Sequence, residues 1–303
     1  LYNNTSGTKN VAVGAGALNA NTTGSQNVAV GYNGLTTQTT GNFNIGMGHD
    51  AGRLITTASN NIFIGQSAGD GTTTGGNNVA VGYNALLANQ TGIQNIAIGT
   101  FALDAATTVA NNVAVGHSAL GANTGGANNV AIGSNVLDSN LGGSDNVGVG
   151  YMALDDNTTG YDNIAIGRDA LGDNIGGFMN HAIGRNCMRL NTTGNYNTAM
   201  GRSTLYSNTT GANNEAFGYN ALNANTTAGG NSAFGSYALR TNTTGAQNVA
   251  VGYRASDATV TNSNCTAVGF YALRYNVQAD ITAVGTSALE NNSSGQYNVA
   301  VGS

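Results

Sequence analysis

Short, mostly apolar triplets recur along the chain at a nearly constant spacing, almost all preceded by Asn and all followed by Gly, as in Asn10 to Gly14. Their alternating β-branched composition is typical of short β-strands. The closing glycines follow one another every 17 residues, except for one interval of 16 between Gly269 and Gly285. Such a unit is too short for a pair of helices and suits one coil of two short strands and two turns. The repeat therefore predicts an all-β parallel β-solenoid of about 18 turns of 17 residues.

Glycine and asparagine hold fixed places in the repeat. The closing glycine never varies, which indicates a positive φ or a backbone contact too close for a Cβ. Asn opens nearly every repeat, and we expect its amide to bond turn backbone or to form a ladder along the solenoid. Because no insertion interrupts the repeat, residues 1–303 are predicted to form a single continuous domain without a linker. The glycines taken as structural turn residues include Gly14, Gly31, Gly82, Gly116, Gly167 and Gly252.

The two faces of the repeated triplet differ in composition. Its middle residue is almost always Ala, which suits the cramped interior of a flattened coil, whereas its first position accepts Glu215. A sealed core does not readily take an unpaired carboxylate, so the first and third residues are expected to point outward. A long exposed Val/Ile stripe needs covering, which predicts a symmetric oligomer. The predicted interface includes Val11, Val13, Val28, Val30, Val79, Val81, Val113 and Val115.

Polar residues interrupt this stripe in four consecutive repeats, with His181, Thr198, Glu215 and Ser232 at the first triplet position. If several chains meet on that face, copies of Glu215 approach one another and repel. We therefore expect a hydrated polar pocket or ion site between about residues 181 and 232, with His181 and Glu215 facing it. The alternative is that the coils splay apart there and these side chains face solvent.

The motif Asn-Val-Ala-Val-Gly, followed by Tyr-Asn-Ala-Leu as at residues 78–86, resembles the head repeat of YadA-type trimeric autotransporter adhesins. It also resembles a repeat of phage tail fibres that end in an endosialidase-type chaperone domain. The Asn-Thr-Thr-Gly turn and the 17-residue period are more similar to this second group. The resemblance implies a left-handed β-roll, three of which pack along a threefold axis without catalytic residues. It also implies an extracellular location, on a cell surface or a virion.

Composition narrows the classes of function. The net charge is −5, which argues against nucleic-acid binding, and no apolar run is long enough for a membrane span. Cys187 and Cys265 lie more than four repeats apart, too far for a disulfide within one chain. The glycines around His49 do not make a dinucleotide motif, and no histidine has metal-ligand spacing to a second ligand. We expect neither a cofactor, nor a metal, nor an enzyme, and we interpret the chain as a fragment of a longer fibre.

The position directly after the closing glycine is occupied by tyrosine or arginine in several repeats. A polar surface for anionic sugars is one interpretation, and a surface salt network with nearby aspartates is the other. This candidate ligand-contacting column includes Arg168, Arg185, Arg202, Tyr151 and Tyr219. Eight of the Asn-x-Ser/Thr sequons lie in one turn column, which we expect to be exposed and to serve as turn residues. They begin at Asn21, Asn89, Asn157, Asn191, Asn208, Asn225, Asn242 and Asn292.

The sequence as a whole favours a structural or adhesive segment of an extracellular trimeric fibre, presenting a rigid rod for attachment to a host or surface. Its expected partners are two further copies of the chain and glycans or receptors of a host cell. Two alternatives stay open: a carbohydrate-binding module that uses the Arg/Tyr column, and the subunit of a self-assembling extracellular filament.

Overall fold

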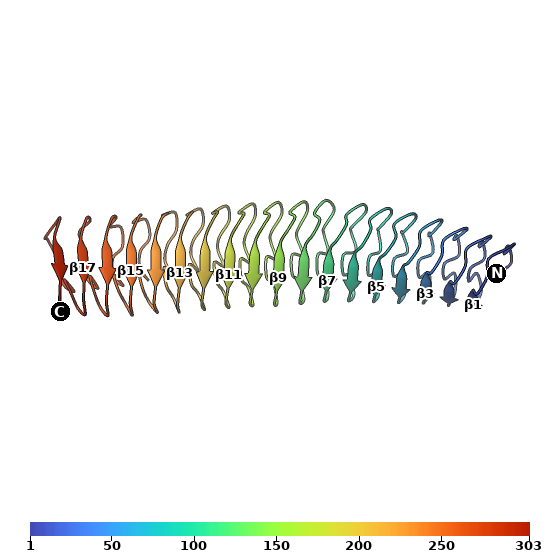
Figure 1. Ribbon diagram of the computed structural model, residues 1–303, viewed down its shortest axis with the longest axis horizontal. Coiled ribbons are helices and arrows are strands. Elements are labelled where there is room, and N and C mark those ends of the chain that lie inside the picture. The colour runs from blue at the N-terminus through green and yellow to red at the C-terminus, as the bar shows by residue number, and fades with distance from the viewer. The chain divides into compact units, whose positions relative to one another are not determined.

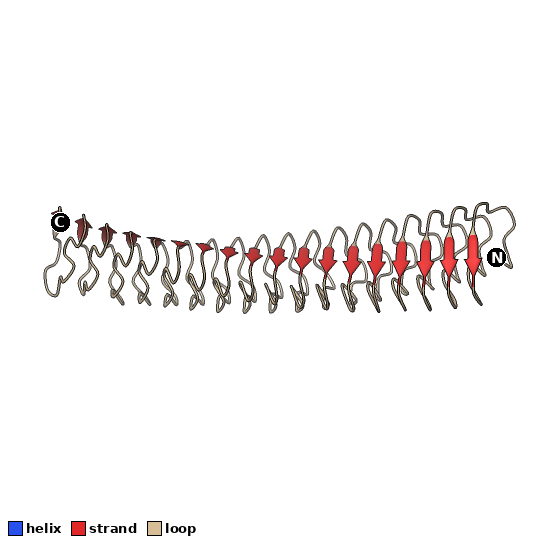
Figure 2. Ribbon diagram, turned by 90° about the horizontal axis from the view of Figure 1, so that it is seen from below, coloured by secondary structure: helices blue, strands red, loops and turns tan.

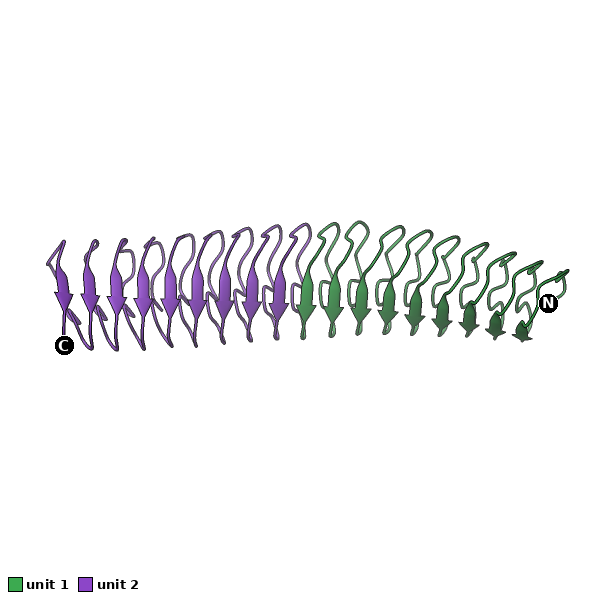
Figure 3. Ribbon diagram, in the orientation of Figure 1, with its two compact units in different colours: residues 1–152 green, residues 153–303 purple.

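The computed structural model describes all residues from Leu1 to Ser303, in two compact units, Leu1–Met152 and Ala153–Ser303 (Figure 3). All regular secondary structure consists of three-residue β-strands. The first unit holds β1 (Val11–Val13), β2 (Val28–Val30), β3 (Ile45–Met47), β4 (Ile62–Ile64), β5 (Val79–Val81), β6 (Ile96–Ile98), β7 (Val113–Val115), β8 (Val130–Ile132) and β9 (Val147–Val149). The second holds β10 (Ile164–Ile166), β11 (His181–Ile183), β12 (Thr198–Met200), β13 (Glu215–Phe217), β14 (Ser232–Phe234), β15 (Val249–Val251), β16 (Thr266–Val268), β17 (Thr282–Val284) and β18 (Val299–Val301).

Within each unit, successive strands pair in parallel and in register (Figure 1). Val11 lies opposite Val28 in the first unit, and His181 lies opposite Thr198 in the second. The strands form one wall of the coils, and turns and loops form the rest (Figure 2). This arrangement confirms the predicted all-β parallel solenoid. The structure contains no helical segment that could span a membrane.

The expectation of two strands in each coil is wrong, because only one segment per coil is extended. In the second coil, Asn33 and Leu35 have φ values of 53° and 50°, so the segment after the closing glycine is tightly curled. The backbone N–H of Leu35 nevertheless donates to the carbonyl of Ala51 in the next coil at 3.0 Å. The left-handed region costs about 1–2 kcal/mol for a residue with a Cβ. Burial of the leucine side chain offsets this cost.

The interior of each coil is thin. The middle strand residue points inward and is fully buried, as at Ala29 and Ala80, which confirms the predicted inner face. Leucines of the curled segment, among them Leu35 and Leu86, are also fully buried and supply most of the apolar volume. A small residue on the strand wall therefore accompanies a large one on the curled wall.

One coil reverses this division of volume. Phe63 occupies the alanine position of β4 and is fully buried. The leucine position of its own coil and of the preceding coil is glycine, at Gly69 and Gly52. A Cβ added at Gly69 would lie 2.6 Å from the Phe63 ring, and one at Gly52 would lie 2.7 Å from it. The phenyl ring thus fills space that two leucines fill in other coils.

The single 16-residue repeat keeps its strand register. Thr266 pairs with Thr282, and Val268 pairs with Val284, so the missing residue is absorbed outside the strands. In the shortened loop Asn276 donates to the carbonyl two residues ahead, at Gln278, whereas the equivalent asparagines reach three residues ahead. The Thr-Ala-Val-Gly pattern that begins at both Thr266 and Thr282 predicts that the turns absorb the deletion, and the register confirms this.

Candidate functional site

The first and third residues of each strand form an outward wall of the solenoid, here called the strand face. The structure places all eight valines predicted for an interface on this outer surface. Val11 and Val13 are 48% and 57% exposed, and the six valines of β2, β5 and β7 are half-buried by their neighbours along the wall. The strand face therefore presents two apolar columns to its surroundings.

The polar interruption lies where predicted, on the strand face of β11 to β14. His181 and Glu215 are exposed there. The neighbouring column becomes larger over the same strands, and it includes Phe217 and Phe234, whose rings stack at 5.0 Å. Apolar surface lost from one column is thus partly replaced in the other.

The closing glycines have both of the predicted features, a positive φ and a backbone contact too close for a Cβ. Gly116 has a φ of 138°, and a Cβ there would lie 2.2 Å from the carbonyl oxygen of Gly133 in the next coil. Contacts of the same kind, under 3.0 Å, occur at Gly14, Gly31, Gly82, Gly167 and Gly252. These glycines set how closely successive coils stack.

Two ladders of buried asparagine amides run inside each unit. In the first ladder, Oδ1 of Asn27 accepts from the backbone N–H of Asn44 at 2.9 Å, while its Nδ2 donates to the carbonyl of Gly41 at 2.9 Å. The amide therefore links the start of its own strand to the start of the next strand, and also to the loop that leads into that next strand. The prediction that this asparagine bonds turn backbone and forms a ladder is confirmed.

The second ladder corrects the expectation that the sequon column is exposed. Seven of the eight sequon asparagines, all except Asn292, are fully buried. Asn208, for example, donates to Oδ1 of Asn191 at 2.8 Å and to the carbonyl of Gly211 at 3.0 Å. The amide turns inward because it satisfies the closing turn and the preceding coil together. No glycan fits on these side chains in the folded solenoid.

The Arg/Tyr column predicted from sequence lies on the outer surface, after the closing glycines. Arg168 pairs with Asp169 at 3.2 Å, as the salt-network interpretation expects. Arg185 and Arg202 are exposed and have no carboxylate partner, and the Arg202 guanidinium lies 5.9 Å from the Tyr219 ring. Tyr151 and Tyr219 are 47% and 40% exposed. The structure therefore does not gather the three arginines into one salt network.

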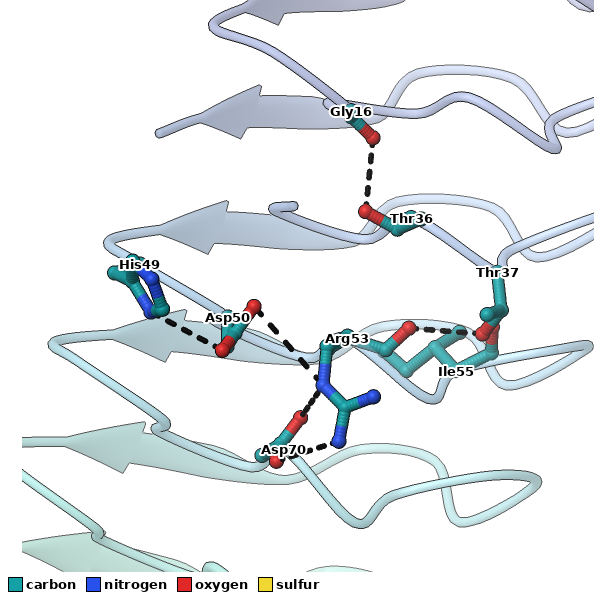
Figure 4. Close-up of polar contacts among 8 residues, drawn as sticks. All are labelled: Gly16, Thr36, Thr37, His49, Asp50, Arg53, Ile55 and Asp70. Carbon is teal, nitrogen blue, oxygen red and sulfur yellow. Dashed lines mark hydrogen bonds and ion pairs between the residues drawn. The ribbon is translucent and has the colours of Figure 1, made fainter. Parts of the chain in front are cut away.

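Sequence reasoning missed a second charged column, five residues after the closing glycine. In the first unit Arg53 donates two hydrogen bonds to Asp70 of the next coil, at 2.9 and 3.2 Å (Figure 4). These bonds raise the pKa of Arg53 further. Asp50 lies 4.0 Å from the same guanidinium and 3.1 Å from His49. The signal was present in the sequence, as opposite charges spaced by one repeat.

In the second unit this column alternates in sign over four successive coils. Arg240 lies 2.9 Å from Asp257, and Arg274 lies 3.6 Å from Glu290. The side chain of Asp257 is only 4% exposed, and Arg254 approaches it to 3.8 Å. Burial raises the pKa of Asp257, although the three arginines act in the opposite direction. The buried carboxylate thus anchors guanidinium groups on the surface.

Aromatic rings surround these arginines. Arg254 lies between Tyr237 and Tyr253, with its guanidinium carbon 5.2 and 5.5 Å from the two ring centroids. Arg274 lies 4.3 Å from Tyr271 and 4.6 Å from Tyr275. The aromatic–arginine face is defined here as Arg202, Tyr219, Tyr237, Arg240, Tyr253, Arg254, Phe270, Tyr271, Arg274 and Tyr275. It extends well beyond the column that the sequence indicated.

A cavity of about 140 Å³ lies at the shortened coil. It is next to the aromatic–arginine face, because Asn276 directly follows Tyr275 and the N–H of Ala258 donates to the carbonyl of Arg274 at 2.9 Å. Val260 and Val277 on its rim are 49% and 55% exposed. Its lining consists of Ala258, Val260, Thr261, Asn262, Asn276 and Val277.

The remaining titratable groups are dispersed. Cys187 and Cys265 are free and buried, and burial raises the pKa of the Cys187 thiol to about 12. The carboxyl groups of Asp104 and Asp138 both lie next to Gly121. A Cβ added at Gly121 would lie 3.7 Å from Oδ1 of Asp104 and 2.5 Å from Oδ1 of Asp138. Burial raises the pKa of both carboxyl groups. No three His, Cys, Asp or Glu side chains lie close enough together to hold a metal ion.

The chain was compared with known proteins at the level of sequence. A scan against protein-family models and a search of the curated proteins both found no match to this chain.

Proposed function

We propose that the chain is a structural segment of an extracellular fibre, in which three copies pack through their strand faces. The observation that carries this proposal is the pair of outward apolar columns along the strands, with side chains such as Ile96 and Ile98 at 37% and 39% exposure. Strands stack at about 4.8 Å, so the nine strands of one unit present a stripe roughly 40 Å long. A stripe of that length gains stability when another apolar surface covers it.

The number of copies and the extracellular location rest on the resemblance of the repeat to adhesin heads and phage tail fibres. Low charge and regular ladders suit a segment whose role is mechanical, because every coil is held by bonds to its neighbours. The interior offers no space for a substrate, since its volume is filled by alanine, leucine and asparagine side chains.

The mass of the assembly in solution tests the proposal. We expect sedimentation equilibrium to give three times the 30.3 kDa of one chain. The double variant Val79→Lys, Val113→Lys places charges on the strand face and should dissociate the assembly. Tyr83→Lys is the matched control, since Tyr83 is exposed on the curled wall and should not affect the mass. A folded monomer of the unmodified chain contradicts the proposal.

The polar interruption gives a second test of the same trimer. Three copies of Glu215 near one axis repel, and this repulsion is relieved only by water, a cation or polar partners. We expect Glu215→Gln to stabilise the trimer against dissociation in low salt and to have little effect at high salt. If the substitution changes nothing at either salt concentration, the coils splay apart at β13 and Glu215 faces solvent.

A further inference from the structure

The aromatic–arginine face carries exposed rings that the proposed packing of strand faces does not use. Tyr253, Phe270 and Tyr275 are 39%, 47% and 45% exposed. Tyr253 and Phe270 directly follow closing glycines, and Tyr275 lies further along the curled wall, so none of the three belongs to the strand face. Large aromatic side chains left open to solvent in one cluster mark a surface for recognition.

The rings do not form a closed stack. Tyr219 meets Tyr237 edge to face at 5.2 Å with an interplanar angle of 85°. Tyr237 meets Tyr253 in the same way at 6.0 Å and 88°. Tyr253 and Phe270 instead stack on each other at 5.5 Å with an interplanar angle of 19°, so only the ring faces turned toward each other are covered in that pair. Exposed apolar ring surface nevertheless extends over several coils, because Tyr219, Tyr253 and Phe270 are 40%, 39% and 47% exposed.

The charge of this face differs from that of the whole chain. Four arginines meet only two carboxylates here, those of Asp257 and Glu290, whereas the chain carries a net charge of −5. Arg202 has no carboxylate partner, and the Arg240 side chain is 38% exposed beside Asp257. Guanidinium groups donate in pairs to carboxylate and sulfate oxygens.

We propose that the aromatic–arginine face binds an acidic glycan. The apolar C–H faces of sugar rings stack on exposed aromatic rings, and the acidic groups accept hydrogen bonds from Arg202 and Arg240. Single-stranded nucleic acid also stacks on aromatic rings, but it carries one phosphate per nucleotide and requires a strongly basic groove. The carboxylates of Asp257 and Glu290 and the acidic chain disfavour so dense a polyanion.

The cavity beside Tyr275 gives the surface a concave end. Its rim combines the apolar Val260 and Val277 with the exposed, hydroxyl-bearing Thr261. A sugar substituent with a small apolar group and a hydrogen-bonding group fits such a hollow better than the convex coils around it. We place one end of the bound glycan here, at the only repeat shortened to 16 residues.

Binding to defined probes tests the inference on the full chain. The probes are hyaluronan oligosaccharides with one carboxylate per disaccharide, κ-carrageenan oligosaccharides with one sulfate per disaccharide, neutral cello-oligosaccharides and oligothymidine, titrated calorimetrically. The variants are Tyr253→Ala with Phe270→Ala, and Arg202→Gln. The matched control is Tyr83→Ala, because Tyr83 follows Gly82 at the same repeat position and is 44% exposed, without an arginine partner.

We expect at least one acidic probe to bind about tenfold more tightly than the neutral one, with affinity that falls as salt is added. The aromatic double variant should weaken binding about tenfold or more, Arg202→Gln should reduce the salt dependence, and Tyr83→Ala should change neither. Absence of binding by both acidic oligosaccharides overturns the proposal. So does equal loss in the Tyr83 control, or binding of oligothymidine alone. The mass measurement on the strand face is independent of all these outcomes.

Discussion

The backbone N–H of Asn44 donates a hydrogen bond of 2.9 Å to the side-chain oxygen of Asn27, one coil earlier. In the same way, the N–H of Asn112 donates to the side-chain oxygen of Asn95, and the N–H of Asn129 donates to that of Asn112. A buried amide thus replaces the water that would otherwise satisfy the start of each strand. The ladder makes the stability of one coil depend on the side chain of the coil before it.

Replacing Asn112 by Asp tests the donor half of this ladder. Asn112 Nδ2 donates to the carbonyl of Gly126 at 3.0 Å, and a carboxylate there would face that oxygen without a proton. We expect a loss of about 3 kcal/mol in the free energy of unfolding at pH 7, measured by urea titration. The neighbouring Asn111→Asp is the control, because Asn111 is exposed.

The pH dependence of Asn112→Asp has a definite sign. Burial beside carbonyl oxygens raises the pKa of the new carboxyl group above its unfolded value. Its destabilisation should therefore be smallest below the unfolded pKa and should grow as pH rises through the folded pKa. A loss that is independent of pH would contradict the assignment of the amide as a donor.

The closing glycine should not tolerate even one added carbon. A Cβ at Gly116 would lie 2.2 Å from backbone of the next coil, and its φ of 138° is unfavourable for alanine. We expect Gly116→Ala to lower the unfolding free energy by about 3 kcal/mol or more. Gly142→Ala is the control, because nothing lies within 4 Å of a Cβ there. Equal melting temperatures for the two variants would show that the coils can separate without cost.

Phe63 should be replaceable only together with its two glycines. Phe63→Ala leaves a cavity and should cost about 3–5 kcal/mol in unfolding free energy. Adding Gly52→Leu and Gly69→Leu restores the arrangement of the other coils and should recover most of that loss. The φ values of 58° and 60° at these glycines are close to that of Leu86, at 55°, so the leucine backbone fits, and at Gly52 the Leu35 side chain, 2.9 Å from the added Cβ, has to move aside. If the three substitutions lower the unfolding free energy additively, the Phe63 ring does not take the place of the two leucine side chains.

Asp138 should make the first unit less stable as pH rises. Its folded pKa is raised by burial, so the stability it contributes is present below the unfolded pKa and lost as pH rises through the folded pKa. Asp138→Asn should therefore raise the melting temperature at pH 7 and change it little at pH 3. The exposed Asp145 provides the control substitution Asp145→Asn. Identical effects of both substitutions at pH 7 would exclude burial as the cause.

Cys187 should report on unfolding of its coil. Its side chain is fully buried, its Sγ lies 3.3 Å from the carbonyl of Ala199, and the pKa of about 12 keeps it protonated at pH 8. We expect no alkylation by iodoacetamide in the folded chain at pH 8 and complete alkylation in denaturant. Rapid labelling of the native chain would mean that the coil of β11 opens readily.

The period of the repeat was sufficient to predict the parallel coils, the inward alanines and the strand register across Gly269 and Gly285. It did not predict the curled wall, because Leu35 is an apolar residue whose type gives no sign of a left-handed φ. It also placed Asn21 on the outside, since a turn column does not reveal which way its amide points. The pairing of Arg240 with Asp257 was readable as opposite charges one repeat apart, but only if each column is followed along the whole chain.

The buried sequons determine which cells can produce this protein in folded form. An oligosaccharyltransferase in a eukaryotic secretory pathway acts on the chain as it emerges, before coils have stacked, so Asn191 and Asn208 would be accessible at that moment. A glycan attached then has no place inside a coil where both amides are fully buried, and the second ladder could not close. Synthesis in a compartment without that enzyme avoids the conflict, and secretion from yeast or mammalian cells requires the sequon threonines to be replaced first.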